Sequence, residues 1–219
     1  KFSLNGKVAI VTGSDTGLGQ GFSKAFVEAG AKVLGVSVVP STATQEMLGK
    51  ENFEFITADL STLDPIEGII QKALDTFGHI DILVNNAGII KREDTIDFGV
   101  ENWDSVINVN LRTLFFLSQA VAKQFLKQNS GGKIISVASM LSYQGGIRVP
   151  SYTASKSAVK GITMTMANEW AQYGINVNAI APGYMATNNT QALRSDKDRS
   201  EAILDRIPAG RWGTPDDIM

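Results

Sequence analysis

The most informative absences in this sequence are those of cysteine and histidine. The 219-residue chain has no cysteine and a single histidine, His79. Disulfides, thiolate catalysis and cysteine-ligated zinc are therefore excluded, and a cluster of histidine ligands is impossible. We interpret His79 as a surface or capping residue, because no residue near it in the sequence would complete a triad with it. No bound metal is expected.

A strong net charge and a long apolar run are also missing. The formal net charge is −2 and the basic residues are scattered, which argues against nucleic acid or an anionic membrane as a partner. No apolar run approaches the ~20 residues that span a bilayer, and the opening KFSLNGKVAIVTG lacks the apolar core and cleavage site of a signal peptide. The sequence predicts a cytoplasmic protein that binds a small molecule.

Short runs rich in valine and isoleucine alternate with segments of helical period. The runs lack polar alternation, which is typical of strands buried on both faces of a parallel sheet. No linker divides the chain, so the pattern predicts one domain over residues 1–219, an α/β fold with a Rossmann-like, doubly wound parallel sheet flanked by helices. We expect strands at residues 8–13, 32–38, 53–57, 80–86, 133–139 and 175–181, helices at about 18–29, 62–77, 101–128 and 152–173, and further helices over the sheet from about residue 188.

A glycine-rich loop follows the first predicted strand. It reads TGSDTGLG, with Gly13, Gly17 and Gly19 spaced as GxxxGxG, and a segment of helical period comes next. Glycines permit a tight turn and close backbone approach, and the start of a helix offers free N–H groups to a diphosphate. Glycines also end strands for structural reasons alone, but the strand before and the helix after favour a dinucleotide site.

The sequence is less decisive about which dinucleotide binds. An acidic residue at the end of the second strand is typical of NAD sites, and a nearby arginine is typical of NADP sites. Here that position is Ser37, and no arginine or lysine occurs between Val33 and Lys50. Because a 2′-phosphate would have no counter-charge there, the sequence favours NAD over NADP.

Seven short motifs then occur in a characteristic order. A tyrosine and a lysine four residues apart are weak evidence alone, whereas the ordered set is specific. The motifs are TGSDTGLG (12–19), Asp59 in ADL, NNAG (85–88), Asn110 in NVNL, Ser139, YTASK (152–156) and PGYMAT (182–187). With these motifs the chain resembles the short-chain dehydrogenase/reductase family through nearly its whole length.

The resemblance implies an NAD-dependent oxidoreductase and a homotetramer. It assigns catalysis to four residues, which are Asn110, Ser139, Tyr152 and Lys156. It also implies that Thr187 and the backbone near Met185 hold the nicotinamide carboxamide, and that Asp59 binds the adenine amine. The full set of expected cofactor-binding residues is Gly13, Asp15, Thr16, Gly17, Leu18, Gly19, Ser37, Asp59, Leu60, Asn86, Ala87, Gly88, Tyr152, Lys156, Pro182, Gly183, Met185 and Thr187.

Proton transfer at neutral pH requires an unusual tyrosine. Tyr152 and Lys156 are four residues apart on a predicted helix and thus on one face. The lysine charge and the positive nicotinamide ring are expected to lower the pKa of Tyr152 from near 10 towards 7, where it can act as acid or base. Ser139 would hold the substrate oxygen, and Asn110 would orient a water leading from Lys156; by itself, Asn110 is equally consistent with a structural amide that bends a helix.

Longer stretches resemble family members that act on deoxy sugar acids. They include GGKIISVASMLSYQGGIRVPSYTASKS and INVNAIAPGYMATNNTQALR. They imply reversible oxidation of a secondary alcohol on a deoxy sugar acid, in the breakdown of hexuronates from pectin. We hypothesise that Arg148 recognises the substrate carboxylate, or else is a solvated or subunit-contact arginine. Further substrate candidates are Gln144, Lys91, Arg92 and Asn188, besides Ser139 and Tyr152, with Tyr143 as a wall of the pocket.

Two alternatives remain open at this stage. One is a sibling substrate, such as gluconate oxidised at carbon 5 or another small polyol, because loops and not motifs select the substrate. The other is a non-catalytic nucleotide sensor, although its usual sign, loss of the tyrosine or the lysine, is missing. Family members usually continue for about 30 residues, with a final strand and a terminal segment that helps to build a homotetramer, so that strand is expected to be missing here.

Overall fold

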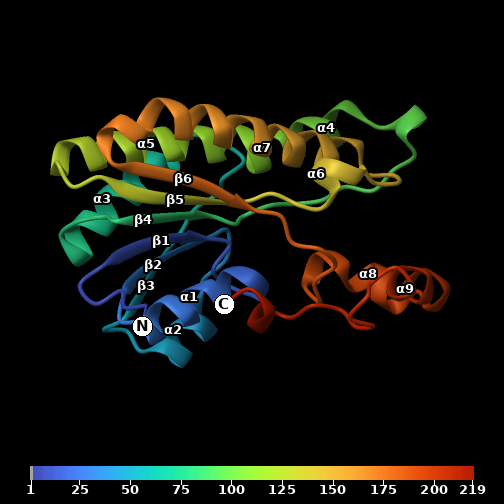
Figure 1. The fold of residues 1–219 in the computed structure, drawn as a ribbon, viewed down its shortest axis with the longest axis horizontal. Helices are drawn as coiled ribbons and strands as arrows, with labels where there is room; N and C mark the ends of the chain where they lie inside the picture. Colours follow the sequence, from blue (N-terminus) through green and yellow to red (C-terminus); the bar gives the residue numbers. More distant parts are fainter. Residues whose placement is uncertain (1) are drawn as a thin grey trace.

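The central element is a parallel sheet with helices on both sides (Figure 1). The computed structural model describes residues 2–219. Within them the six strands lie in the order β3-β2-β1-β4-β5-β6, all parallel. The strands are β1 (Val8–Thr12), β2 (Lys32–Ser37), β3 (Phe53–Thr57), β4 (Ile82–Asn85), β5 (Gly132–Val137) and β6 (Ile175–Ile180). The prediction of a doubly wound α/β sheet is confirmed.

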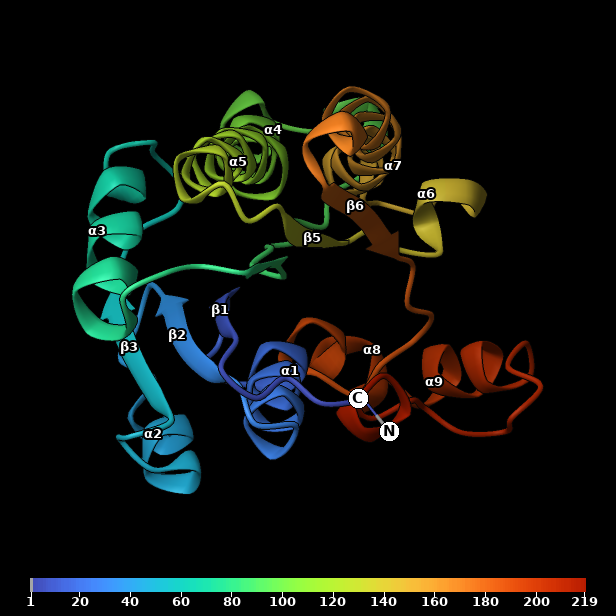
Figure 2. The same cartoon turned by 60° about the vertical axis from the view of Figure 1, so that its left-hand side comes forward.

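Helices cover both faces of the sheet (Figure 2). On one face lie α3 (Pro65–Phe77), α4 (Val100–Ile107), α5 (Leu114–Gln128) and α7 (Pro150–Trp170), and on the other lie α1 (Gly17–Glu28) and α2 (Thr42–Leu48). Each face has its own apolar core, so the strands are buried on both sides. This burial is the reason that their sequences do not alternate with polar residues.

Local sequence signals set several helix ends. Proline stands at the first helical position of α3 and of α7, where its missing N–H costs nothing. Gly78 ends α3 in the left-handed conformation, and Asn129, with φ of 52°, ends α5 in the same way. The lengths of these helices therefore follow from the chain itself.

The helix predicted over residues 101–128 is not continuous. A π-helical segment, η2 (Asn108–Thr113), separates α4 from α5. A π-helical turn displaces the side chains that follow it, and such turns are frequent at functional sites. Two short helices were not predicted, α2 and α6 (Leu141–Gln144), because each is too short to show helical periodicity.

The prediction that the final helices lie over the sheet is wrong. Helices α8 (Gln191–Ser195) and α9 (Lys197–Leu204) extend beyond the carboxyl ends of the strands (Figures 1 and 2). The chain then returns to α1, where Pro215 lies close to Gly21 and Ile218 packs on the core. Within residues 2–219 no strand follows β6, which lies at the edge of the sheet.

None of the helices in residues 2–219 combines the length and apolar character that a bilayer crossing requires.

Candidate active site

Two adjoining cavities open at the carboxyl ends of the strands. An inner cavity of about 110 Å³ is lined by Ser139, Tyr152 and Lys156. A second cavity of about 260 Å³ lies over the glycine loop and is lined by Gly13, Asp15 and Gly17. The residues that line both are Leu18, Asn86, Gly88, Thr187 and Asn189. The shared lining makes one cleft that leads from the loop to the tyrosine.

The glycine loop is closed tightly enough to exclude side chains. Gly13 has φ of +67° and Gly17 has φ of +56°, a conformation that favours glycine. A Cβ atom on Gly19 would lie 1.9 Å from the carbonyl oxygen of Gly13. The amide of Asn86 donates to the carbonyls of Thr12 and Gly13, at 2.9 and 3.2 Å. The loop and the start of α1 thus form a bare backbone cradle that fits a diphosphate.

Asp15 of this loop reaches the end of β2. The Ser37 hydroxyl donates to Asp15 Oδ1 at 2.9 Å, and the Asp15 N–H donates back to Ser37 Oγ at 3.2 Å. Ser37 is buried and lines neither cavity, whereas Asp15 is half-buried and lines the loop cavity. An acidic group therefore lies at the end of β2, contributed by the loop and held by Ser37.

The NNAG segment is fixed by the end of β1. Thr12 Oγ1 accepts hydrogen bonds from the backbone N–H groups of Asn86 and Ala87, at 3.0 and 2.9 Å. This anchoring aligns the chain after β4 with the floor of the cleft. Thr12 is not among the predicted site residues, although its place at the end of a buried strand was a usable signal.

Asp59 and Leu60 lie outside the cleft. Asp59 is exposed after β3 and accepts from the backbone N–H of Ser61 at 2.8 Å. Leu60 is buried in the core. By contrast, the PGYMAT residues lie where they are expected, since Pro182, Gly183, Met185 and Thr187 line the inner cavity.

The four expected catalytic side chains come from three different elements. Tyr152 and Lys156 lie on the first turns of α7, Ser139 follows β5, and Asn110 lies on η2. Lys156 is buried, and its Nζ donates to the carbonyl of Val137 at 2.6 Å and lies 5.7 Å from the centre of the Tyr152 ring. The helix spacing therefore places tyrosine and lysine together, as the sequence predicts.

Burial and neighbouring groups act on the pKa of Tyr152 in opposite directions. Burial raises its pKa, and the lowering effects of a hydrogen bond from Ser139 and the positive charge of Arg92 are smaller. The backbone N–H of Leu141 donates to Ser139 Oγ at 3.1 Å, which leaves the hydroxyl hydrogen free for Tyr152. The Lys156 ammonium, which is expected to lower the pKa of Tyr152 together with the nicotinamide ring, donates to the carbonyl of Val137.

Lys156 is perturbed by the same burial. Loss of solvent lowers its pKa from 10.5 to about 8. The ammonium is therefore still mostly protonated at pH 7 and becomes neutral a little above it. Its charge is available to stabilise a phenolate in the neutral range.

Asn110 is a fully buried amide with a defined set of partners. Its Oδ1 accepts from the Ile89 N–H at 2.8 Å, and its Nδ2 donates to the Ile89 carbonyl at 2.9 Å and to Ser155 Oγ at 3.2 Å. The π-helical turn directs this amide towards the segment after β4. Asn110 thus ties η2 to the cleft and to α7.

A third, outer cavity of about 650 Å³ lies between the loop after β5 and helix α9. Gln144 and Arg148, two of the expected substrate residues, line it. Arg148 has φ of 63°, and its guanidinium forms an ion pair with Asp94 at 2.7 Å. Asn188 does not line this cavity but belongs to the one over the glycine loop. With Ser139 and Tyr152 in the inner cavity, the expected substrate residues are therefore divided among three cavities.

Tyr143 is not a wall of this cavity. It is 63% exposed, and Lys160 lies 4.3 Å from the centre of its ring. Arg92 does line the outer cavity, with Arg199 and Arg206 of the final helical segment. Lys91, next to Arg92 in the chain, is exposed and lines none of the three cavities. No sequence motif indicated Arg199, because its place depends on how α9 folds back.

Comparison with known proteins agrees with this arrangement. The sequence profile of the family described as short chain dehydrogenase matches residues 7–198. A 2-dehydro-3-deoxy-D-gluconate 5-dehydrogenase from Escherichia coli is 61% identical over 221 residues, which is 100% of this chain and 87% of that protein.

Two solved structures are also similar. One is a candidate 2-deoxy-D-gluconate 3-dehydrogenase from Agrobacterium tumefaciens with bound NADP, with 50% identity, a TM-score of 0.91 and coverage of 99% of this chain and 87% of that one. Another is a candidate NAD(P)-dependent gluconate 5-dehydrogenase from Beutenbergia cavernae with NADP at low occupancy, with 41% identity, a TM-score of 0.93 and coverage of 99% and 88%. The chain therefore belongs to the short-chain dehydrogenase family and is an NAD(P)-dependent dehydrogenase acting on alcohol groups.

Proposed function

We propose that this protein catalyses reversible hydride transfer between NAD and a secondary alcohol of a deoxy sugar acid, 2-dehydro-3-deoxy-D-gluconate or 2-deoxy-D-gluconate. The observation that carries the proposal is the inner cavity, which brings Tyr152, Ser139 and Lys156 together beside the glycine-loop cavity. The relatives whose names carry these sugar acids support the substrate class.

Tyr152 is the proton-transferring group in this proposal. During oxidation its phenolate accepts the alcohol proton while Ser139 donates a hydrogen bond to the substrate oxygen. Hydride acceptance is the chemistry that a bound nicotinamide supplies. Because burial raises the pKa of Tyr152 in the protein alone, Lys156, Arg92 and the positive charge of the oxidised ring must together favour the phenolate.

Lys156 and Asn110 assist this proton transfer without contacting the substrate alcohol. The Lys156 ammonium can bond the nicotinamide ribose once it leaves the Val137 carbonyl. Asn110 holds the Ile89 backbone on one side and Ser155 on the other, and we propose that it orients a water that returns protons from Lys156 to solvent.

Panel assays with purified protein test the activity. We expect the protein to oxidise 2-deoxy-D-gluconate faster than gluconate. We also expect it to reduce the ketone formed by oxidation of 2-dehydro-3-deoxy-D-gluconate faster than it turns over gluconate. Tyr152→Phe is expected to keep NADH binding, measured by fluorescence, while kcat falls by orders of magnitude. Full activity of that variant would overturn the mechanism, and NADH binding with no turnover of any sugar acid or polyol would favour a nucleotide sensor.

Gluconate is the runner-up substrate. Two structural relatives are described as candidate gluconate dehydrogenases, one of them for carbon 5. Gluconate differs from 2-deoxy-D-gluconate by the hydroxyl on carbon 2, so it tests whether the outer cavity accepts a hydroxyl at that carbon. A kcat/KM for gluconate above that for the deoxy acid would assign the protein to this activity.

We also propose a preference for NAD over NADP, carried by Asp15. Its carboxylate, fixed by Ser37, lies at the end of β2, where a ribose 2′-hydroxyl could donate to it and a 2′-phosphate would be repelled. The NADP bound in two relatives makes this a sharp point to test.

Asp15→Asn tests the cofactor preference. We expect the ratio of kcat/KM for NAD over NADP to fall at least about tenfold, because like-charge repulsion is lost. Asp64→Asn, which removes an exposed carboxylate at the start of α3, is the control and should leave the ratio unchanged. A wild-type preference for NADP, or an unchanged ratio in Asp15→Asn, would contradict the assignment.

We propose further that the protein assembles with copies of itself into a homotetramer. Phe116 and Leu126 of α5 and Met164 of α7 are 38%, 48% and 55% exposed, although they are large and apolar. Apolar exposure on adjacent helices is typical of interfaces. Light scattering after gel filtration measures the assembly directly, and a monomer at micromolar concentration would exclude it.

A further inference from the structure

The outer cavity carries more positive charge than its acidic neighbours balance. Its lining includes four arginines, Arg92, Arg148, Arg199 and Arg206, and one carboxylate, Asp196. Arg148 is paired with Asp94 outside the lining set, and Asp196 accepts from the backbone N–H of Arg199 at 3.1 Å. In residues 2–219 the guanidinium groups of the other three arginines form no ion pair.

Arg92 stands between the catalytic tyrosine and the final helices. Its Nη2 donates to the carbonyl of Asn189 at 2.8 Å, which directs the side chain across the cleft, since Asn189 itself lines the inner cavity. The guanidinium is close enough to Tyr152 and to Arg199 for its charge to act on both. Arg92 therefore links the reacting end of the site to the outer cavity.

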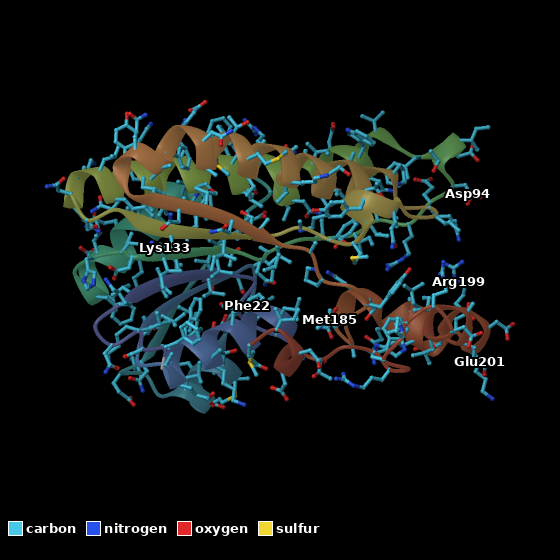
Figure 3. All side chains as sticks on the ribbon, viewed as in Figure 1. Phe22, Asp94, Lys133, Met185, Arg199 and Glu201 are labelled. Carbon is cyan, nitrogen blue, oxygen red and sulfur yellow. The ribbon has the colours of Figure 1, made fainter. Side chains whose placement is uncertain are left out.

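Arg199 approaches from the opposite wall. It lies on α9, on the side that faces the rest of the molecule, whereas Glu201 lies on the other side (Figure 3). Arg92 and Arg199 line the same cavity, and two guanidinium charges repel. Burial is the main cause that lowers the pKa of Arg92, and the charge of Arg199 adds to it. A bound anion between them would remove this repulsion and give each a charge-assisted partner.

We propose that Arg92 and Arg199 form a two-arginine subsite that binds the carboxylate of the substrate while the alcohol lies at Tyr152 and Ser139. This proposal rests on the proposed function and adds the residues that would distinguish sugar acids from neutral sugars. Arg148 is the weaker candidate for this role because Asp94 already neutralises it.

Arg92 would then have a second, separable effect on the reaction. Its charge is one of the two groups that lower the pKa of Tyr152. Removal of Arg92 should shift the pH profile of kcat/KM to more alkaline values even with a substrate that has no carboxylate, whereas removal of Arg199 should not. A merely structural role would not produce this difference.

Binding can be measured without turnover in the abortive complex with NADH. Both NADH and 2-deoxy-D-gluconate are reduced, so they cannot react, and calorimetry gives the affinity of the sugar acid directly. We expect Arg92→Gln and Arg199→Gln each to weaken 2-deoxy-D-gluconate about 10- to 100-fold with unchanged NADH affinity, because each loses a charge-assisted bond. In turnover, KM for the acid should rise similarly, while KM for the neutral alditol 2-deoxy-D-glucitol should not change.

The controls separate this proposal from its alternatives. Arg112→Gln removes an exposed arginine that lines none of the three cavities and should not affect binding. Unchanged sugar-acid affinity in both Arg92→Gln and Arg199→Gln would overturn the subsite, as would a loss in Arg148→Gln as large as theirs. Binding that the two variants lose, without turnover by the wild type, would support the subsite and refute the proposed function.

Discussion

Replacement of Lys156 by methionine should stabilise the protein at neutral pH while abolishing its activity. Lys156 is fully buried, and its ammonium has the Val137 carbonyl as its hydrogen-bond acceptor. Methionine has a similar length and flexibility but carries no charge. The variant therefore removes the cost of a buried charge and, at the same time, one hydrogen bond.

The size of the effect follows from the pKa of the lysine. Burial lowers the pKa from 10.5 to about 8. Each tenfold change in proton affinity is worth about 1.4 kcal/mol, so burying the ammonium costs about 3 kcal/mol at pH 7. In the variant the Val137 carbonyl loses its hydrogen bond, and this loss offsets about 1–3 kcal/mol of the gain in stability. We expect a net stabilisation of about 0–2 kcal/mol.

The pH dependence isolates the charge from the hydrogen bond. Between pH 8 and 10.5 the unfolded chain binds a proton that folded Lys156 has lost, so the wild type gains stability relative to the variant as the pH rises. Urea unfolding at pH 7 and pH 9.5 should show the difference between Lys156→Met and wild type move by about 2 kcal/mol in favour of wild type. Lys24→Met, at an exposed position on α1, is the control for lost net charge. A difference that does not change with pH would refute the argument that the buried ammonium is costly.

Two further substitutions test the frame of the site. Gly19→Ala places a Cβ 1.9 Å from the Gly13 carbonyl oxygen, so the free energy of unfolding in urea should fall by about 1–3 kcal/mol or more. NADH titration of this variant should show weak or no binding. The control is Gly161→Ala, which has open space at its Cβ on α7 and should be neutral or slightly stabilising. Asn110→Ala leaves the Ile89 N–H and carbonyl without their side-chain partners, and should cost about 2–4 kcal/mol in the same assay. A stable Asn110→Ala variant with normal activity would contradict both its structural and its proposed water-orienting role.

The strands were predictable because their burial leaves a direct record in the sequence. A strand covered on both faces must be apolar throughout, and the runs at residues 8–13, 32–38 and 53–57 coincide with β1, β2 and β3 to within a residue at either end. Periodicity could not reveal the π-helical turn at η2, since a single extra residue in a turn leaves the apolar pattern of residues 101–128 nearly unchanged.

The site also has features that the sequence predicts and features that it does not. Tyr152 and Lys156 are four residues apart on one helix, so local geometry alone made them neighbours. The sequence could not say that burial would raise the pKa of the tyrosine, because the loss of solvent depends on every element packed around it. Nor could it pair Asp15 with Ser37, which the loop and β2 bring together from 22 residues apart.

By itself, then, the sequence determined the order of strands and helices, the glycine cradle and the tyrosine–lysine pair, because each depends on residues close together in the chain. Only the tertiary structure decided which charges meet. Arg92 and Arg199 come from segments 107 positions apart in the numbering, and their approach depends on where α9 lies beyond the sheet. Electrostatic interactions act through space and not along the chain, so the character of the outer cavity was set by folding.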